Sequence, residues 1–345
     1  MIVDKSVIDV MEKHLSSRSK VAVVFKVLTH NVVETQSNAD YILDILCGCV
    51  LEDGEKVGDS FTIQLDKSIQ LLKSCEGDSV KIQNMRDRIV FSKSSVVIPY
   101  PKAYDDIVDI PVNTLVSPGA VQSTNLESIS RGFRKLVNVS KVLDKGVPSV
   151  IIYNGKSYCL YSNTMLISDV PRTLPDMEIP YNTFSNITKN LGSGSMDVYL
   201  DTNKKVLVLS SKNLRITTTY KVPGDSTITA IEGKVASLES LGDFTIDNLS
   251  TMEMVFKCFD KETVTVSFNQ DGKLGFLLSV SDGKAITSGV REDTPKLNIV
   301  LSTAQIDSLY KVFALNTKVS ILYGTDVVVF KTSGKQMIVS GMTFR

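Results

Sequence analysis

The chain has 345 residues, more than the roughly 100–150 of an average domain, which predicts two or three domains. Hydrophobic residues make up 43% and charged residues 22%, and no run of about 18 apolar residues is present, so the composition excludes a helical membrane protein. Basic and acidic residues balance at 38 each, which excludes a strong overall field for nucleic acid and leaves only local basic surfaces.

The first third of the chain predicts a helix with a strand, and then a fuller unit of strand, helix and three strands. Short β-branched runs separated by polar turns are typical of antiparallel strands, and apolar residues at helical spacing indicate the helices. In chain order we expect helix 7–15, strand 21–25, strand 61–65, helix 66–74 and strands 79–82, 88–92 and 95–98.

The same order of elements returns in the middle and last thirds. The middle third predicts helix 126–145, strand 150–153, strand 177–181, helix 182–189 and strands 197–200, 205–210 and 214–217. The last third predicts helix 249–259, strand 263–267, strand 297–301, helix 302–311 and strands 318–322, 326–330 and 336–340. A repeat of this kind determines the architecture before any single element does.

The repeat predicts an α+β protein of three tandem domains, each with two helices packed on antiparallel sheets. Segments rich in Asp and Pro near 101–118, and polar with scattered Gly near 223–240, are interpreted as linkers. We therefore expect domains at 1–115, 116–225 and 226–345.

The residues offer no convincing catalytic or metal site, so we expect a protein that is not an enzyme and needs no cofactor. The two histidines, His14 and His30, stand outside any nucleophile or metal-ligand pattern. The cysteines are interpreted as buried free thiols, although the close pair Cys47 and Cys49 leaves a metal or redox role open. They are Cys47, Cys49, Cys75, Cys159 and Cys258.

This arrangement resembles the bacterial-type DNA polymerase sliding clamp over essentially the whole chain. The tail 338–345 is similar to the apolar-plus-arginine end of that family, and Tyr153-Asn154-Gly155 is similar to the Leu-Asn-Gly hairpin of its middle domain. Residues 162–166 depart from the family's Thr-Asp-Gly-His-Arg-Leu-like turn. That departure suggests a divergent, viral or phage-encoded clamp.

The resemblance implies a non-catalytic processivity factor. Two copies of the chain would close a ring around double-stranded DNA, and a DNA polymerase and a clamp loader would bind through short linear peptides. The place of action would be the cytoplasm of a bacterium or of an infected cell, since the N-terminal segment also lacks a secretory signal.

Sliding requires weak, sequence-blind contacts with phosphates, so the resemblance places lysine and arginine of the helices at the DNA. Helix 126–145 is the most basic helical stretch of the chain. Any single basic residue on a helix can equally be an ordinary solvated side chain. The expected DNA-binding residues are Arg131, Arg134, Lys135, Lys141, Lys73, Lys189, Arg18, Lys20, Lys257 and Lys311.

The family's peptide pocket lies between the middle and last domains, and matching positions imply its wall in this chain. Apolar side chains with a flexible Met suit promiscuous peptide binding, although each could equally belong to the core. The implied wall residues are Tyr153, Thr164, Met165, Leu166, Met342, Phe344 and Arg345. A second hypothesis remains, in which the chain is a clamp-fold interaction hub that no longer encircles DNA and acts in transcription or in binding host factors.

Overall fold

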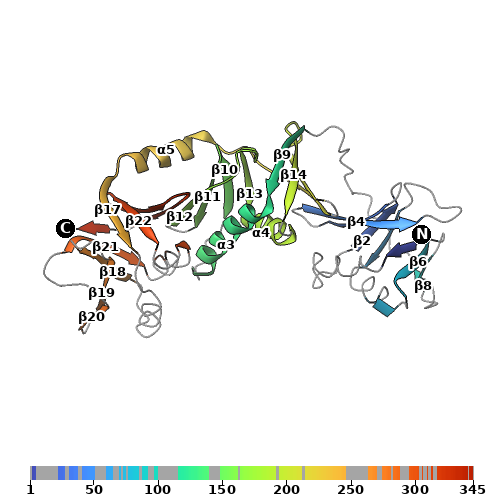
Figure 1. Ribbon diagram of the computed structural model, residues 1–345, viewed down its shortest axis with the longest axis horizontal. Helices are drawn as coiled ribbons and strands as arrows, with labels where there is room; N and C mark the ends of the chain where they lie inside the picture. Colours follow the sequence, from blue (N-terminus) through green and yellow to red (C-terminus); the bar gives the residue numbers. More distant parts are fainter. Residues whose placement is uncertain are drawn as a thin grey trace. The chain divides into compact units, whose positions relative to one another are not determined.

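A computed structural model of the chain describes two compact units (Figure 1). One unit comprises residues 1–124 and 186–221, and the other comprises residues 125–185 and 222–345. The residues described are 2–4, 22–27, 31–37, 41–50, 60–64, 70, 73–74, 77–84, 88–91, 97–99, 116–139, 148–161, 164–191, 194–211, 214–245, 263–269, 274–280, 283–287, 295–302, 305, 309, 312–313, 317–340 and 342–344.

The strands follow the β-branched runs of the sequence. Those of the first unit are β1 Ile2–Asp4, β2 Ala22–Val27, β3 Asn31–Ser37, β4 Tyr41–Val50, β5 Ser60–Gln64, β6 Ser79–Asn84, β7 Arg88–Phe91, β8 Val97–Pro99, β9 Val116–Gln122, β14 Ser195–Asp201, β15 Val206–Ser210 and β16 Leu214–Thr219. Those of the second are β10 Ser149–Tyr153, β11 Lys156–Tyr161, β12 Thr164–Asp169, β13 Met177–Pro180, β17 Glu239–Thr245, β18 Thr263–Asn269, β19 Leu274–Val280, β20 Gly283–Thr287, β21 Pro295–Ser302, β22 Lys318–Tyr323, β23 Val327–Thr332, β24 Lys335–Ser340 and β25 Met342–Phe344.

Three helices are described over their whole length. They are α3 Ser123–Val139, α4 Tyr181–Asn190 and α5 Asp225–Ala236. Single helical residues are also described at 70, 73–74, 305, 309 and 312, inside or next to two of the helices that the sequence predicts.

The first unit contains one sheet with the strand order β8-β7-β6-β1-β4-β16-β15-β14-β9, and a branch in which β3 pairs with β4, β2 with β3 and β5 with β2. All its strand pairs are antiparallel, and alternate residues such as Leu43, Ile45, Val198 and Ile216 are fully buried. The sheet continues from β4 to β16, so strands from the first third and the middle third of the chain hydrogen-bond directly.

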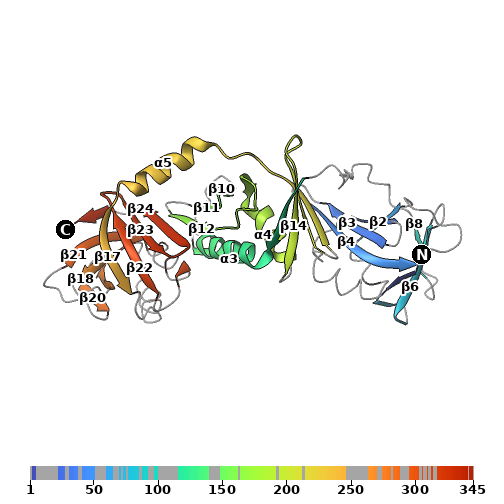
Figure 2. The ribbon, with the colours of Figure 1, turned by 45° about the horizontal axis from the view of Figure 1, so that its top comes forward.

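The second unit contains two antiparallel sheets, ordered β13-β10-β11-β12-β24-β23-β22-β17 and β20-β19-β18-β21-β25. In the larger sheet β12 pairs with β24, with Met165 opposite Ile338, so strands of the middle and last thirds again join (Figure 2). Helix α3 packs against β12 at Gly132, where an added Cβ would lie 2.9 Å from Cδ2 of Leu166.

The predicted repeat is visible in the order of the elements. Strand β13, helix α4 and strands β14, β15 and β16 follow one another, and β21 is followed by helical residues and then β22, β23 and β24. The Asn154-Gly155 turn joins β10 to β11 with φ of 47° and 73°, the left-handed pair that a tight hairpin requires. The antiparallel α+β architecture is therefore confirmed.

One interpretation was wrong. The segment 223–240, interpreted as a linker, contains helix α5 at Asp225–Ala236 and the first residues of β17. Its serine, threonine and glycine residues suggested a loop, but Ile228 is buried in a cluster with Tyr158, Met165 and Ile167. Burial against the neighbouring sheet stabilises this helix despite the modest helix propensity of its residues.

Candidate functional site

Helix α3 has one buried face and one basic face. Leu126, Ile129 and Phe133 are buried, and the Phe133 ring meets the Tyr181 ring edge-on at 4.5 Å. Arg131 and Arg134 are both exposed, three residues apart, and therefore lie on the same side of the helix. The pattern of small and apolar residues thus turns these two guanidinium groups away from the core.

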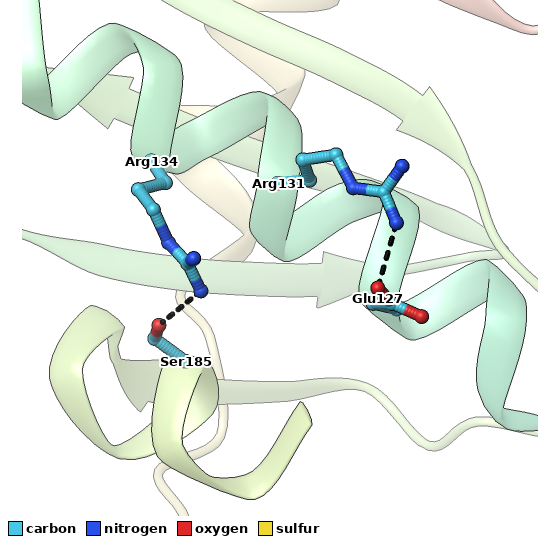
Figure 3. Close-up of polar contacts among 4 residues, drawn as sticks. All are labelled: Glu127, Arg131, Arg134 and Ser185. Carbon is cyan, nitrogen blue, oxygen red and sulfur yellow. Dashed lines mark hydrogen bonds and ion pairs between the residues drawn. The ribbon is translucent and has the colours of Figure 1, made fainter. Parts of the chain in front are cut away.

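The two arginines have different partners within the described part of the chain (Figure 3). Arg131 donates to a carboxylate oxygen of Glu127 at 2.6 Å, in an ion pair whose side chains are 64% and 50% exposed. Arg134 donates to the hydroxyl of Ser185 on α4 at 3.4 Å. An exposed i,i+4 ion pair contributes only about 0.3–0.5 kcal/mol, so Arg131 can exchange Glu127 for another anion at little cost.

The other expected DNA-binding residues lie on several elements. Lys189 is exposed in the last turn of α4, and Lys73 is exposed at a helical residue. Lys135 belongs to α3, but its side chain lies outside the described part of the structure. The remaining residues lie outside the described ranges: Lys141, Arg18, Lys20, Lys257 and Lys311.

An open apolar pocket of about 240 Å³ lies in the second unit, beside the junction of β12 and β24. Strands β11 and β12 contribute Leu160 and Met165, while β23 and β24 contribute Val327 and Ile338. Helix α5 and Leu238 after it supply another part of the wall. The remaining lining residues are Ile231, Lys234, Val235, Leu238 and Asp326.

Its size and lining favour apolar side chains as occupants. The volume is below the about 300 Å³ at which pockets for whole small molecules begin. The two charged residues of the lining pair with each other, because Lys234 Nζ donates to Asp326 Oδ2 at 3.0 Å. Leu160 is 52% exposed at the pocket, which leaves apolar surface for a binding partner.

The sequence predicted one of these lining residues. Met165 lines the pocket. Tyr153 does not, but it packs against the hydrophobic cluster to which Met165 belongs. Thr164 and Leu166 are buried and are not among the lining residues. The backbone of Met342 and Phe344 forms β25, paired with β21, and their side chains and Arg345 lie outside the described part of the chain.

The α5 wall of the pocket was missed. Ile231 and Val235 are four residues apart, which brings them to one face of a helix, and Leu238 follows three residues later, just after α5 ends. This pattern was present in the sequence, and the surrounding Gly, Ser and Thr residues obscured it.

A polar cluster attaches α5 to β11 next to the pocket. Glu232 accepts hydrogen bonds from Lys156 at 2.9 Å and from the hydroxyl of Tyr158 at 2.8 Å. The bond from Lys156, followed by that from Tyr158, lowers the pKa of Glu232 below its usual value. Burial, followed by the bond to Glu232, raises the pKa of Tyr158 well above its usual value, so the phenol stays protonated and donates.

Within the described residues, no group of three or more His, Cys, Asp and Glu side chains could hold a metal ion. No described helix is long and apolar enough to span a membrane. Cys159 is a fully buried free thiol, as expected, and burial raises its pKa above the usual value.

No protein-family model and no curated protein sequence matches this chain. Among solved structures, the DNA polymerase sliding clamp of Bacillus subtilis aligns with a TM-score of 0.73 at 12% identity, covering 99% of this chain and 98% of that one. The chain has the sliding-clamp fold.

Two further structures with this fold align over the full length. The DNA polymerase beta subunit of Streptococcus pyogenes gives a TM-score of 0.74 at 11% identity, with 99% of each chain covered. The Helicobacter pylori beta clamp bound to a DNA ligase peptide gives 0.68 at 11% identity, covering 99% of this chain and 100% of that one. The expected resemblance is therefore confirmed for the fold.

Proposed function

We propose that this chain is a DNA sliding clamp, a non-catalytic processivity factor that encircles double-stranded DNA and tethers a DNA polymerase. The observation that carries the proposal is the full-length likeness to clamps of bacterial DNA polymerases, with TM-scores of 0.73 and 0.74 over 98–99% of those chains. A clamp works by enclosing its substrate, which requires neither a cofactor nor a metal ion of its own.

The basic face of α3 supplies the DNA contact in this proposal. Arg131 and Arg134 are exposed on one side of the helix, and Lys135 follows directly in the sequence. Long, flexible cations that point to solvent bind phosphates without reading bases, which is what sliding requires. The other expected basic residues would add contacts of the same kind.

The apolar pocket would receive short peptides of the polymerase, the clamp loader and other partners. It supports this role because its wall is apolar, contains the flexible Met165 and includes the exposed Leu160. The Helicobacter pylori clamp with the same fold was solved with a DNA ligase peptide, which favours a peptide partner here. The proposal also includes three domains, at 1–115, 116–225 and 226–345. Two copies of the chain would form a homodimeric ring, which would act in the cytoplasm of a bacterium or of an infected cell.

Ring closure separates this function from the alternative of an interaction hub. The test combines native mass with retention on nicked circular DNA, and we expect a dimer that is retained on the circle and released when the circle is linearised. A monomer at micromolar concentration without topological retention would favour the hub.

A variant tests the role of α3. Replacing Arg131, Arg134 and Lys135 with Ala should weaken retention and reduce the salt dependence of binding, by about 0.9 in the log–log slope for each phosphate that is no longer neutralised. The matched control replaces three exposed lysines outside the helices, Lys204, Lys221 and Lys331, with Ala. Equal losses of retention in the two variants would show that α3 has no special part in binding.

A further inference from the structure

Helix α5 is held by charged contacts on both of its sides. Glu232 accepts from Lys156 and Tyr158 of β11, at 2.9 and 2.8 Å. Lys234, two residues on, reaches in the other direction to Asp326, which directly precedes β23. The helix is thereby tied both to the strand that carries Leu160 and to the turn that carries Asp326.

The contact between α5 and the turn before β23 is close. Gly324 lies in this turn, where its N–H donates to the carbonyl oxygen of Val327 at 2.8 Å. A Cβ added at Gly324 would lie 2.9 Å from Cδ2 of Leu238, which follows α5 and lines the pocket. The turn and the α5 wall therefore meet at the pocket with no room to spare at this point.

The Lys234–Asp326 pair joins the same two parts of the chain, α5 and the turn before β23. Both side chains line the pocket and are 55% and 67% exposed, while the pocket-lining Ile231 and Val235 come from the same helix as Lys234. Because a helix moves as a rigid element, holding Lys234 also holds the apolar residues beside it. Breaking the pair would remove one of the polar contacts that hold α5, so that its wall could shift relative to Val327 while the bonds at Glu232 remain.

We propose that the Lys234–Asp326 ion pair is a positioning contact that sets the opening of this pocket for the uncharged apolar side chain of a partner peptide. The inference rests on the proposed function, because it specifies what the peptide pocket accepts and how its width is maintained. The charges of the two residues offset each other at the pocket, so the site selects an apolar anchor. Neither charge is needed as a direct contact to the peptide.

The test measures the affinity of uncharged, fluorescein-labelled hexapeptides that carry Leu, Ile, Met or Phe at two adjacent central positions. Lys234→Met and Asp326→Asn should each weaken binding about two- to five-fold, the size of an exposed ion pair. The exchanged pair, Lys234→Asp with Asp326→Lys, should restore the wild-type affinity. Raising the salt from about 50 mM to about 500 mM should weaken binding to the wild type more than to either single variant.

The matched control is another exposed ion pair of the same length. Lys318 contacts Asp243 at 3.0 Å between β22 and β17, and neither residue lines the pocket. Lys318→Met should therefore leave peptide affinity unchanged. Unchanged affinity in both Lys234→Met and Asp326→Asn, or an exchanged pair that fails to restore binding, would overturn the positioning role.

A separate variant tests the pocket itself. Leu160 is 52% exposed, so Leu160→Asp should keep the fold while it places a charge on the apolar wall. If wild-type protein binds peptide and Leu160→Asp does not, the pocket is the binding site and the ion-pair variants decide the inference alone. If no hexapeptide binds the wild type, or Leu160→Asp binds equally well, both the pocket assignment and the positioning role fail.

Discussion

The buried ion pair between β4 and β16 predicts a large and asymmetric effect of mutation. Asp44 and Arg215 are directly opposite each other in the register of these strands, and the Nε and Nη2 atoms of Arg215 both lie 2.6 Å from Oδ2 of Asp44. The Asp44 side chain is 5% exposed and the Arg215 side chain 25%. Arg215 therefore retains access to water that Asp44 lacks.

Removing the cation should cost more than removing the anion. Arg215→Met takes the guanidinium away from a carboxylate that is almost fully buried, and breaking a buried pair in this way costs about 3–5 kcal/mol. Asp44→Asn keeps an oxygen that accepts from the partly exposed Arg215, so its cost should be smaller, about 1–3 kcal/mol, the range for a buried polar group that is left incompletely satisfied. At about 2–4 °C per kcal/mol, Arg215→Met should lower Tm by about 6–20 °C.

Calorimetry of the full chain, with hydrogen exchange of the amides in β4 and β16, measures both effects. The ion pair connects two strands whose residues are 171 positions apart in the sequence. Without it these strands should open more often, so hydrogen exchange of their amides should be faster in Arg215→Met. An Arg215→Met variant within about 1 kcal/mol of wild type, or an Asp44→Asn variant that is the less stable of the two, would refute the reasoning.

Three further predictions concern the second unit. Because the folded-state pKa of Glu232 is lowered, its bonds to Lys156 and Tyr158 stabilise the fold above the usual glutamate pKa. This contribution should be lost as the pH falls below about 4.5. Hydrogen exchange of the α5 amides, measured against pH, tests this, and a Glu232→Gln variant should show no such loss. Gly233→Ala should stabilise the protein by about 0.5–1 kcal/mol, since a Cβ there meets nothing within 4 Å. Gly132→Ala should destabilise it by about 1 kcal/mol, because its Cβ would crowd Leu166. Equal shifts of Tm in the two variants would contradict this contrast. Gly155→Ala should lower the free energy of unfolding in urea by about 1–2 kcal/mol, because its φ of 73° is left-handed and its Cβ would lie 3.0 Å from Cγ of Arg172. An unchanged urea midpoint would show that the turn relaxes without strain.

Local patterns in the sequence were sufficient for some of the elements near the site, whereas β11, β12 and α5 of the pocket were not predicted. The β-branched runs at 150–153 and 326–330 became β10 and β23, and Asn154-Gly155 became the tight turn between two strands. The basic face of α3 also followed from local spacing, because side chains three and four residues apart share one side of a helix. These features depend on neighbours within a few residues, which the sequence shows directly.

Contacts between distant residues were decided by the tertiary structure alone. The sequence could not show that Asp44 lies opposite Arg215, or that Met165 lies opposite Ile338 across β12 and β24. The pocket could not be found from the sequence either, because its lining comes from separate strands and from α5, a segment whose composition is that of a linker. Composition and periodicity thus determined the repeated strand and helix units, whereas burial between distant segments determined which of their side chains form a site.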